Sequence, residues 1–176
     1  MVMARKMPLI SKAACFFIFL TTTAVCIKAL VKNNFSITTQ IVGSKTEQED
    51  DIREAVFRHQ FAHNASAKKQ KAKAYYLALG SLINKRDPSS EFMRRFKGHK
   101  PSVERASLVE ERYGRISGFR DGLIFYIEEI RWINENEVEV SGGYYEGTLS
   151  SSGNKYQVVR KNGKWAVKKD TMKWIS

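Results

Sequence analysis

The chain has only two cysteines, Cys15 and Cys26, and both stand close to its N-terminus. Because no cysteine follows Cys26, the rest of the chain has neither a disulfide framework nor a thiolate metal site. The evidence for an oxidising compartment that paired cysteines would give is missing as well. Whatever folds after Cys26 must therefore be stable without a disulfide.

The sequence motifs of several large enzyme classes are also absent. There is no P-loop, no Rossmann glycine pattern, no G-x-S-x-G motif and no kinase signature. His59 and His63 have the four-residue spacing that places two imidazoles on one helix face, but Gln60 stands where zincins have the general-base glutamate. We interpret both histidines as half-exposed helix residues, and we expect no metal and no cofactor.

The chain begins with an apolar leader. Arg5, Lys6 and Lys12 precede an uncharged stretch from Ala13 to Ile27, which is the organisation of a secretory signal peptide. Residues 13–31 are just long enough to cross a hydrocarbon core of about 30 Å. Residues 1–27 are therefore predicted to be a signal peptide or an N-terminal membrane anchor.

The cleavage sites that end at Ala24 or Cys26 are weak, which favours the uncleaved anchor slightly. A lipid on Cys26 is a further alternative, although the residues before it lack the usual leucine. The basic flank places the N-terminus in the cytoplasm. We expect a membrane-anchored protein with its C-terminal domain exported, or a secreted or periplasmic one.

Positive charge is in excess throughout the remainder. Without Arg5, Lys6 and Lys12, the 30 basic residues fall to 27 against 18 acidic residues, a net charge of +9. Such a surface favours anionic lipid, cell-wall polymer or an acidic partner. The basic residues are spread out rather than clustered on one segment, so we do not expect nucleic-acid binding.

Residues 28–44 are predicted to be a polar tether, and residues 45–176 a single domain. A helix is expected from about Ser44, where Ser44 to Glu47 fit a capping box. Its apolar side is predicted from helical spacing to contain Ile52, Ala55, Val56, His59 and Ala62. Residues 74–83 read as a strand, and residues 87–91 as a turn into a short helix that runs through Phe96 and ends before Gly98.

The C-terminal half has the alternation of β-strands. Strands are predicted at 103–109, 123–133, 137–141, 156–161 and 165–167, with a bulge across Glu128 and Glu129. Gly142 and Gly143 are expected to bend their strand, and Asn162-Gly163 predicts a type I′ hairpin turn. Helices packed on one face of a curled antiparallel sheet make an α+β domain.

Several segments of this half resemble a family of uncharacterised bacterial exported proteins. The matching segments are 87–92, 96–101, 142–146 and 162–165. The likeness extends from about Phe57 to Ser176 and implies no activity. At the level of fold, a long helix before a curled sheet is similar to the cystatin-like and nuclear transport factor two-like cone folds, which include both enzymes and binding modules.

An enzyme built on such a cone needs a carboxylate or histidine in an apolar pocket, opposed by a hydrogen-bond donor. The candidates for lining a pocket are Tyr75, Tyr126, Glu128, Trp132, Tyr144, Tyr145 and Glu146. None is distinguished by its spacing, and tyrosine and tryptophan in a small sheet are commonly packing residues.

Three functions are compatible with these features. The leading one is a non-enzymatic extracytoplasmic module that binds a protein or a small ligand. The first alternative is an isomerase-like or hydrolase-like enzyme with its site in the cone pocket. The second is a basic module that docks on anionic lipid or cell-wall polymer. Separately, the basic turn at residues 97–101 has the composition to hold an anion, but we interpret His99 in it as a loop residue.

Overall fold

The computed structural model describes residues 45–66, 71–109, 121–147 and 150–176. The chain divides into two units, Met1–Thr46 and Glu47–Ser176, and all six strands of the described residues belong to the second. The predicted leader, with both cysteines, and the tether lie outside the described residues. Within the described ranges, no helix combines the length and apolar character needed to cross a membrane.

Residues 45–63 form a long helix, as predicted, although its expected capping box at Ser44 falls outside the described residues. Acidic residues in its first turns pair with Arg53, whose guanidinium lies 2.7 Å from Glu49 and 2.8 Å from Asp50. The prediction for its apolar side was wrong at Ala62, which is exposed. The buried stripe instead consists of Ile52, Val56, Phe57, Gln60 and Phe61.

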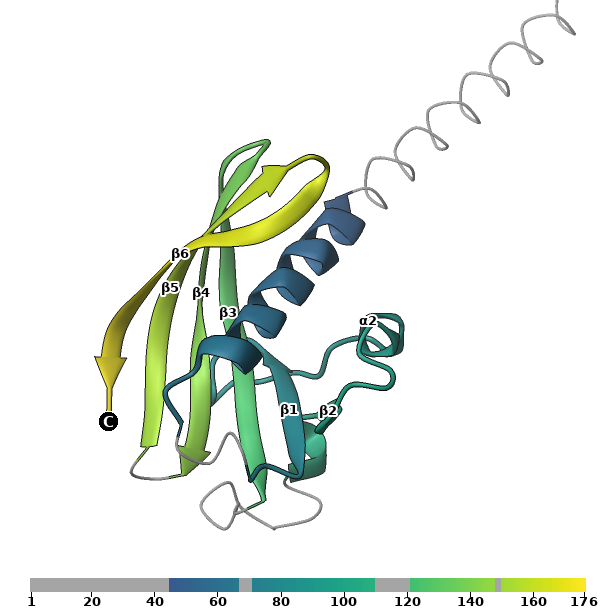
Figure 1. The fold of residues 1–176 in the computed structure, drawn as a ribbon, viewed down its shortest axis with the longest axis vertical. Helices are drawn as coiled ribbons and strands as arrows, with labels where there is room; N and C mark the ends of the chain where they lie inside the picture. The colour runs from purple at the N-terminus through teal and green to yellow at the C-terminus, as the bar shows by residue number, and fades with distance from the viewer. Residues whose placement is uncertain (1–44, 67–70, 110–120, 148–149) are drawn as a thin grey trace, which may run out of the picture. The chain divides into compact units, whose positions relative to one another are not determined.

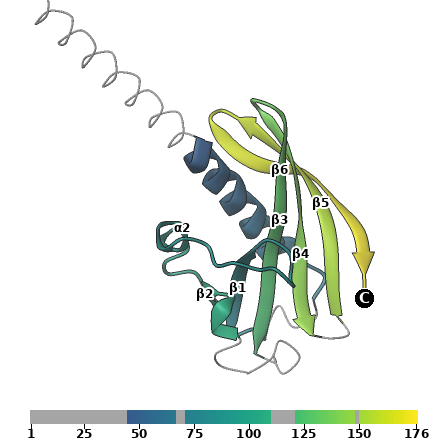
Figure 2. The same ribbon diagram turned by 180° about the vertical axis from the view of Figure 1, so that it is seen from behind.

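This helix lies across one face of a six-stranded sheet (Figure 1), whose order is β2-β1-β3-β4-β5-β6. The strands are β1 (Ala74–Leu79), β2 (Ser102–Arg105), β3 (Gly122–Asn134), β4 (Glu137–Gly147), β5 (Ser150–Lys161) and β6 (Lys164–Ile175). Figure 2 shows the opposite face, with β3 in front of the last turns of the helix.

The expectation of an antiparallel sheet is confirmed for β3 to β6 and wrong for the pairs that β1 makes. β1 pairs in parallel with both β2 and β3. Parallel neighbours need crossover connections, which here are residues 80–101 and 106–121, whereas β3 to β6 follow one another directly. The domain is α+β, with a mixed sheet.

The segment expected as one strand at 103–109 contains two structures. β2 ends at Arg105, and residues 107–109 are helical. The carboxylate of Asp87 accepts hydrogen bonds from the backbone N–H of Ser107 at 3.0 Å and from its hydroxyl at 2.6 Å. This anchor turns the chain, and Ala106 and Val109 are buried on the face of the sheet away from the long helix, together with Tyr76 and Ile124.

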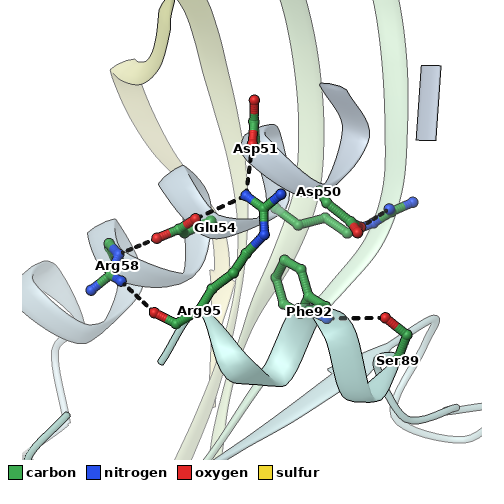
Figure 3. Close-up of polar contacts among 8 residues, drawn as sticks. Asp50, Asp51, Glu54, Arg58, Ser89, Phe92 and Arg95 are labelled. Atoms are coloured by element: carbon green, nitrogen blue, oxygen red, sulfur yellow. Dashed lines mark hydrogen bonds and ion pairs between the residues drawn. The ribbon is translucent and has the colours of Figure 1, made fainter. Parts of the chain in front are cut away.

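A short helix, α2 (Ser90–Arg94), lies beside the long helix (Figure 3). Its N-cap Ser89 accepts a hydrogen bond from Phe92 N–H at 3.1 Å. Arg95, just after α2, donates to Asp51 at 2.6 Å and to Glu54 at 3.0 Å, which joins the two helices.

The predicted Asn162-Gly163 hairpin is confirmed, with positive φ angles of 51° and 76°. The bulge in β3 is also confirmed, because its register with β4 shifts between Ile127 and Glu129. The bend at Gly142 and Gly143 takes another form than expected. β4 stays paired with β5 through both glycines, and the irregularity lies across from them, in β3.

Candidate functional site

The last turns of the long helix and strands β4, β5 and β6 enclose a pocket of about 250 Å³, which we call the helix–sheet pocket. It is lined by Gln60, His63, Asn64, Ala65, Tyr144, Ser152, Asn154, Tyr156, Asp170 and Met172. The lining mixes amide, imidazole, carboxylate and phenol groups with a thioether. Such a mixture fits a small polar ligand better than an apolar one.

Gln60 fixes the helix against the sheet at the base of this pocket. The side chain is only 3% exposed. Its Nε2 has two N–H groups for three acceptors, the carbonyl oxygens of Tyr126 and Gly143, both at 3.3 Å, and the Tyr156 hydroxyl at 3.2 Å, so one N–H is shared between two of them. Its Oε1 is buried and has no hydrogen-bond partner among the described residues.

The glycines of β4 make this close approach possible. A Cβ at Gly142 would stand 2.3 Å from the carbonyl oxygen of Tyr126 and 3.3 Å from Gln60 Nε2. A Cβ at Gly143 would stand 1.9 Å from the carbonyl oxygen of Ser152. Both positions therefore require glycine for lack of space.

Tyr156 supplies a buried hydroxyl to the pocket, and its side chain is 2% exposed. Burial raises its pKa well above the ordinary value, against a smaller lowering by the Gln60 hydrogen bond, and the charge of Asp170 raises it further. The hydroxyl is thus protonated at neutral pH. The Tyr156 hydroxyl accepts a hydrogen bond from Gln60. Its own hydrogen has no acceptor among the described residues and is available to a ligand.

Asp170 in β6 is the carboxylate of the pocket. One oxygen lies 3.0 Å from His59 Nε2, and the other accepts from Asn154 Nδ2 at 2.7 Å. Each carboxylate oxygen keeps accepting capacity beyond these bonds. The side chain is 25% exposed, so a ligand in the pocket can reach it.

The two histidines of the helix have different hydrogen-bond partners, Asp170 for His59 and a backbone carbonyl for His63. Their rings stack at 4.3 Å, and His63 Nδ1 lies 3.1 Å from the carbonyl oxygen of His59, to which it donates. In neutral His63 the other nitrogen, Nε2, is then an acceptor. The described residues contain no group of three or more acidic, histidine or cysteine side chains placed to hold a metal ion.

Of the predicted pocket residues, Tyr144 lines the helix–sheet pocket. Tyr126 contributes its backbone carbonyl to Gln60, while its hydroxyl donates to the carbonyl of Ser152 at 3.1 Å. Burial and, to a lesser degree, the charge of Glu128 raise the pKa of Tyr126 to about 12.

The other five candidates lie elsewhere. Glu128 is exposed, and Glu146 is buried with a hydrogen bond from the Ser66 hydroxyl. Tyr145 packs on the far face of the sheet, and Trp132 packs edge-on against Trp165 at 5.7 Å. Tyr75 lines a different pocket, with His99.

Sequence reasoning missed Gln60, Asn154, Tyr156 and Asp170 as site residues. For Gln60 a signal existed, because it continues the four-residue spacing of Ile52 and Val56 along the buried stripe. Tyr156 and Asp170 stand in strands β5 and β6, and the register that pairs them is set by a bulge between Gln157 and Val158. That bulge has no sequence signature comparable to a glycine pair.

No family model, no curated protein and no solved structure matches the chain.

Proposed function

We propose that the chain is an extracytoplasmic binding module, without enzymatic activity, that takes a small polar ligand in the helix–sheet pocket. The observation that carries this is the convergence of unused hydrogen-bonding capacity there. The Tyr156 hydroxyl has a proton to donate, and the Asp170 carboxylate has lone pairs to accept. A ligand with a donor beside an acceptor, such as an amide or a polyol, complements these groups.

The exported location rests on the basic and apolar pattern of residues 1–27, and the anchoring of the domain on residues 13–31. We also infer a cone of the cystatin-like or nuclear transport factor two-like kind. The support is a long helix against a sheet whose β3 to β6 follow one another antiparallel, and a bulge in β3 at the level of the pocket.

The experiment is a ligand-observed NMR screen of the full chain in detergent, with small amides, polyols, amines and hydroxy acids as separate pools. We expect at least one class to bind, and Tyr156→Phe and Asp170→Asn each to weaken it by about tenfold, the worth of one good hydrogen bond to a charged or buried group. Tyr145→Phe, on the far face of the sheet, is the matched control and leaves binding unchanged. Equal binding by all variants would contradict the proposal.

The enzyme alternative has one observation in its favour, the hydrogen-bonded pair of His59 and Asp170 at the edge of the pocket. Such a pair orients an imidazole for proton transfer. In the same screen, a compound that is consumed over time by the wild type and not by His59→Gln would establish the enzyme and replace the binding module.

A further inference from the structure

A second pocket, of about 340 Å³, lies beside the same helix and is lined by Arg58, Phe61, Ala62, Tyr75, His99 and Lys100. Helix residues two apart point roughly 200° apart. Arg58 and Ala62 therefore face away from Gln60 and Asn64, and the second pocket is separate from the helix–sheet pocket. It brings together the helix, β1 and the turn after α2.

Arg58 is held in place with part of its guanidinium unused. Its Nε donates to Glu54 at 2.8 Å, and its Nη2 donates to the carbonyl oxygen of Arg95 at 3.0 Å (Figure 3). The guanidinium carbon lies 5.0 Å from the centre of the Phe96 ring. Its Nη1, with two N–H groups, has no acceptor among the described residues.

Glu54 is shared between two arginines, so the charges around Arg58 balance and the net positive charge of the pocket comes from Lys100. Besides Arg58, it accepts from Arg95, which also binds Asp51. The two carboxylates are thus matched by two guanidinium groups. Lys100 comes in addition, is exposed, and has no ion pair within the part of the chain that the structure describes.

The remaining polar groups are fixed by packing. His99 Nδ1 lies 2.9 Å from the carbonyl oxygen of Pro101, to which it donates, and the ring stands 5.1 Å from that of Phe61 and 5.9 Å from that of Tyr75. Tyr75 is buried, and burial raises its pKa, so its hydroxyl is a donor. Among the described residues, no acceptor takes that hydrogen.

We propose that this second pocket binds a phosphate group through Arg58, Lys100 and the Tyr75 hydroxyl. Among the described residues no carboxylate lines it, and the three groups come from three different segments. A guanidinium edge with a second cation is the arrangement that recognises tetrahedral oxyanions. The phosphate belongs either to a small solute or to an anionic lipid headgroup, which share this chemistry.

The test uses the full chain in phosphatidylcholine nanodiscs at constant ionic strength, with inorganic phosphate as the probe and the ring signals of His99 as the readout. We expect phosphate to shift these signals, and Lys100→Gln and Arg58→Gln to raise the Kd about tenfold or more. Tyr75→Phe raises it by a smaller factor. Lys97→Gln removes the same charge from an exposed neighbour outside the pocket, and keeps the Kd within about twofold.

Arg58→Gln also breaks the contacts with Glu54 and Arg95 and can therefore unfold the domain. In that case Lys100→Gln, which breaks no described contact, tests the phosphate site. A second arm replaces part of the lipid with phosphatidylglycerol and omits free phosphate. A shift in that arm alone, lost in Lys100→Gln, assigns the site to a lipid headgroup. No shift in either arm, or an equal loss in Lys97→Gln, overturns the proposal.

Discussion

The two flanks of the long helix are built on opposite principles. Toward β3 to β6, Gln60 reaches two carbonyl oxygens and a buried phenol, and two glycines let the backbones approach. Toward α2 and β1, the contact is a cluster of aromatic rings, with Phe57 and Phe92 at 6.0 Å and Phe61 and Tyr75 at 4.9 Å. Buried hydrogen bonds fix the first flank, whereas the second is fixed by apolar packing, with ion pairs to Arg95 at its surface.

This difference has a consequence for tolerance to change. Apolar packing accepts substitutions that conserve volume, whereas a buried polar network loses a whole bond when one member is replaced. The polar flank is also where the helix–sheet pocket lies. We therefore expect the sequence of the polar flank to be the more constrained of the two.

The largest effect is expected from Gly143→Ala. The added Cβ would stand 1.9 Å from the backbone oxygen of Ser152, so β4 or β5 must move, and we expect a loss of about 4 kcal/mol in the free energy of unfolding. Urea denaturation of the full chain measures it. The control is Gly153→Ala, where the three atoms nearest to the added Cβ belong to the side chain of Trp174, which is half exposed and can move. Equal losses would show that backbone approach is not what matters at Gly143.

A pair of near-isosteric changes separates the flanks directly. Gln60→Leu leaves the carbonyls of Tyr126 and Gly143 and the Tyr156 hydroxyl without their donor, and we expect it to cost about 2 kcal/mol. Met93→Leu in α2, on the aromatic flank, conserves the volume of an apolar side chain that packs against the core and should cost less than about 1.5 kcal/mol. If Gln60→Leu proves neutral or stabilising, relief of the unpartnered Oε1 outweighs the lost bonds, and the polar flank is not held by Gln60.

The sequence predicts local features of this fold better than contacts between distant segments. Local signals identified the long helix, the Ser89 turn into α2, the β3 bulge and the Asn162-Gly163 hairpin, because caps, turns and alternation depend on neighbouring residues. The parallel pairing of β1 was not predictable, since it depends on two crossovers rather than on the strand itself. The helix–sheet pocket was found only through Tyr144, because Gln60 meets Tyr156 across 96 residues and His59 meets Asp170 across 111.

Alkaline pH should act on the polar flank through its two buried tyrosines. In the folded chain the pKa of Tyr126 is raised to about 12 and that of Tyr156 further. In the unfolded chain both phenols ionise near pH 10. Between these values the unfolded state has fewer bound protons, so stability is complete below about pH 10 and falls as the pH rises toward 12.

Stability measured by urea denaturation at several pH values checks this, with tyrosinate absorbance recorded in parallel. In the double variant Tyr126→Phe and Tyr156→Phe, the fall above pH 10 should be reduced. The same fall in wild type and double variant would assign it to other groups.

The smallest effect is expected where the polar flank meets solvent. Asp170→Asn weakens the contact with His59, and because both side chains are partly exposed we expect a loss of about 1 kcal/mol. Asp121→Asn, which removes the more exposed pair with Lys73 at 3.3 Å, is the control and should cost less than about 0.5 kcal/mol. The two losses come from thermal unfolding of the full chain at neutral pH. A loss at Asp170 no larger than at Asp121 would mean that this carboxylate contributes nothing to the fold, and its bonds to His59 and Asn154 would then serve only to orient it toward a ligand.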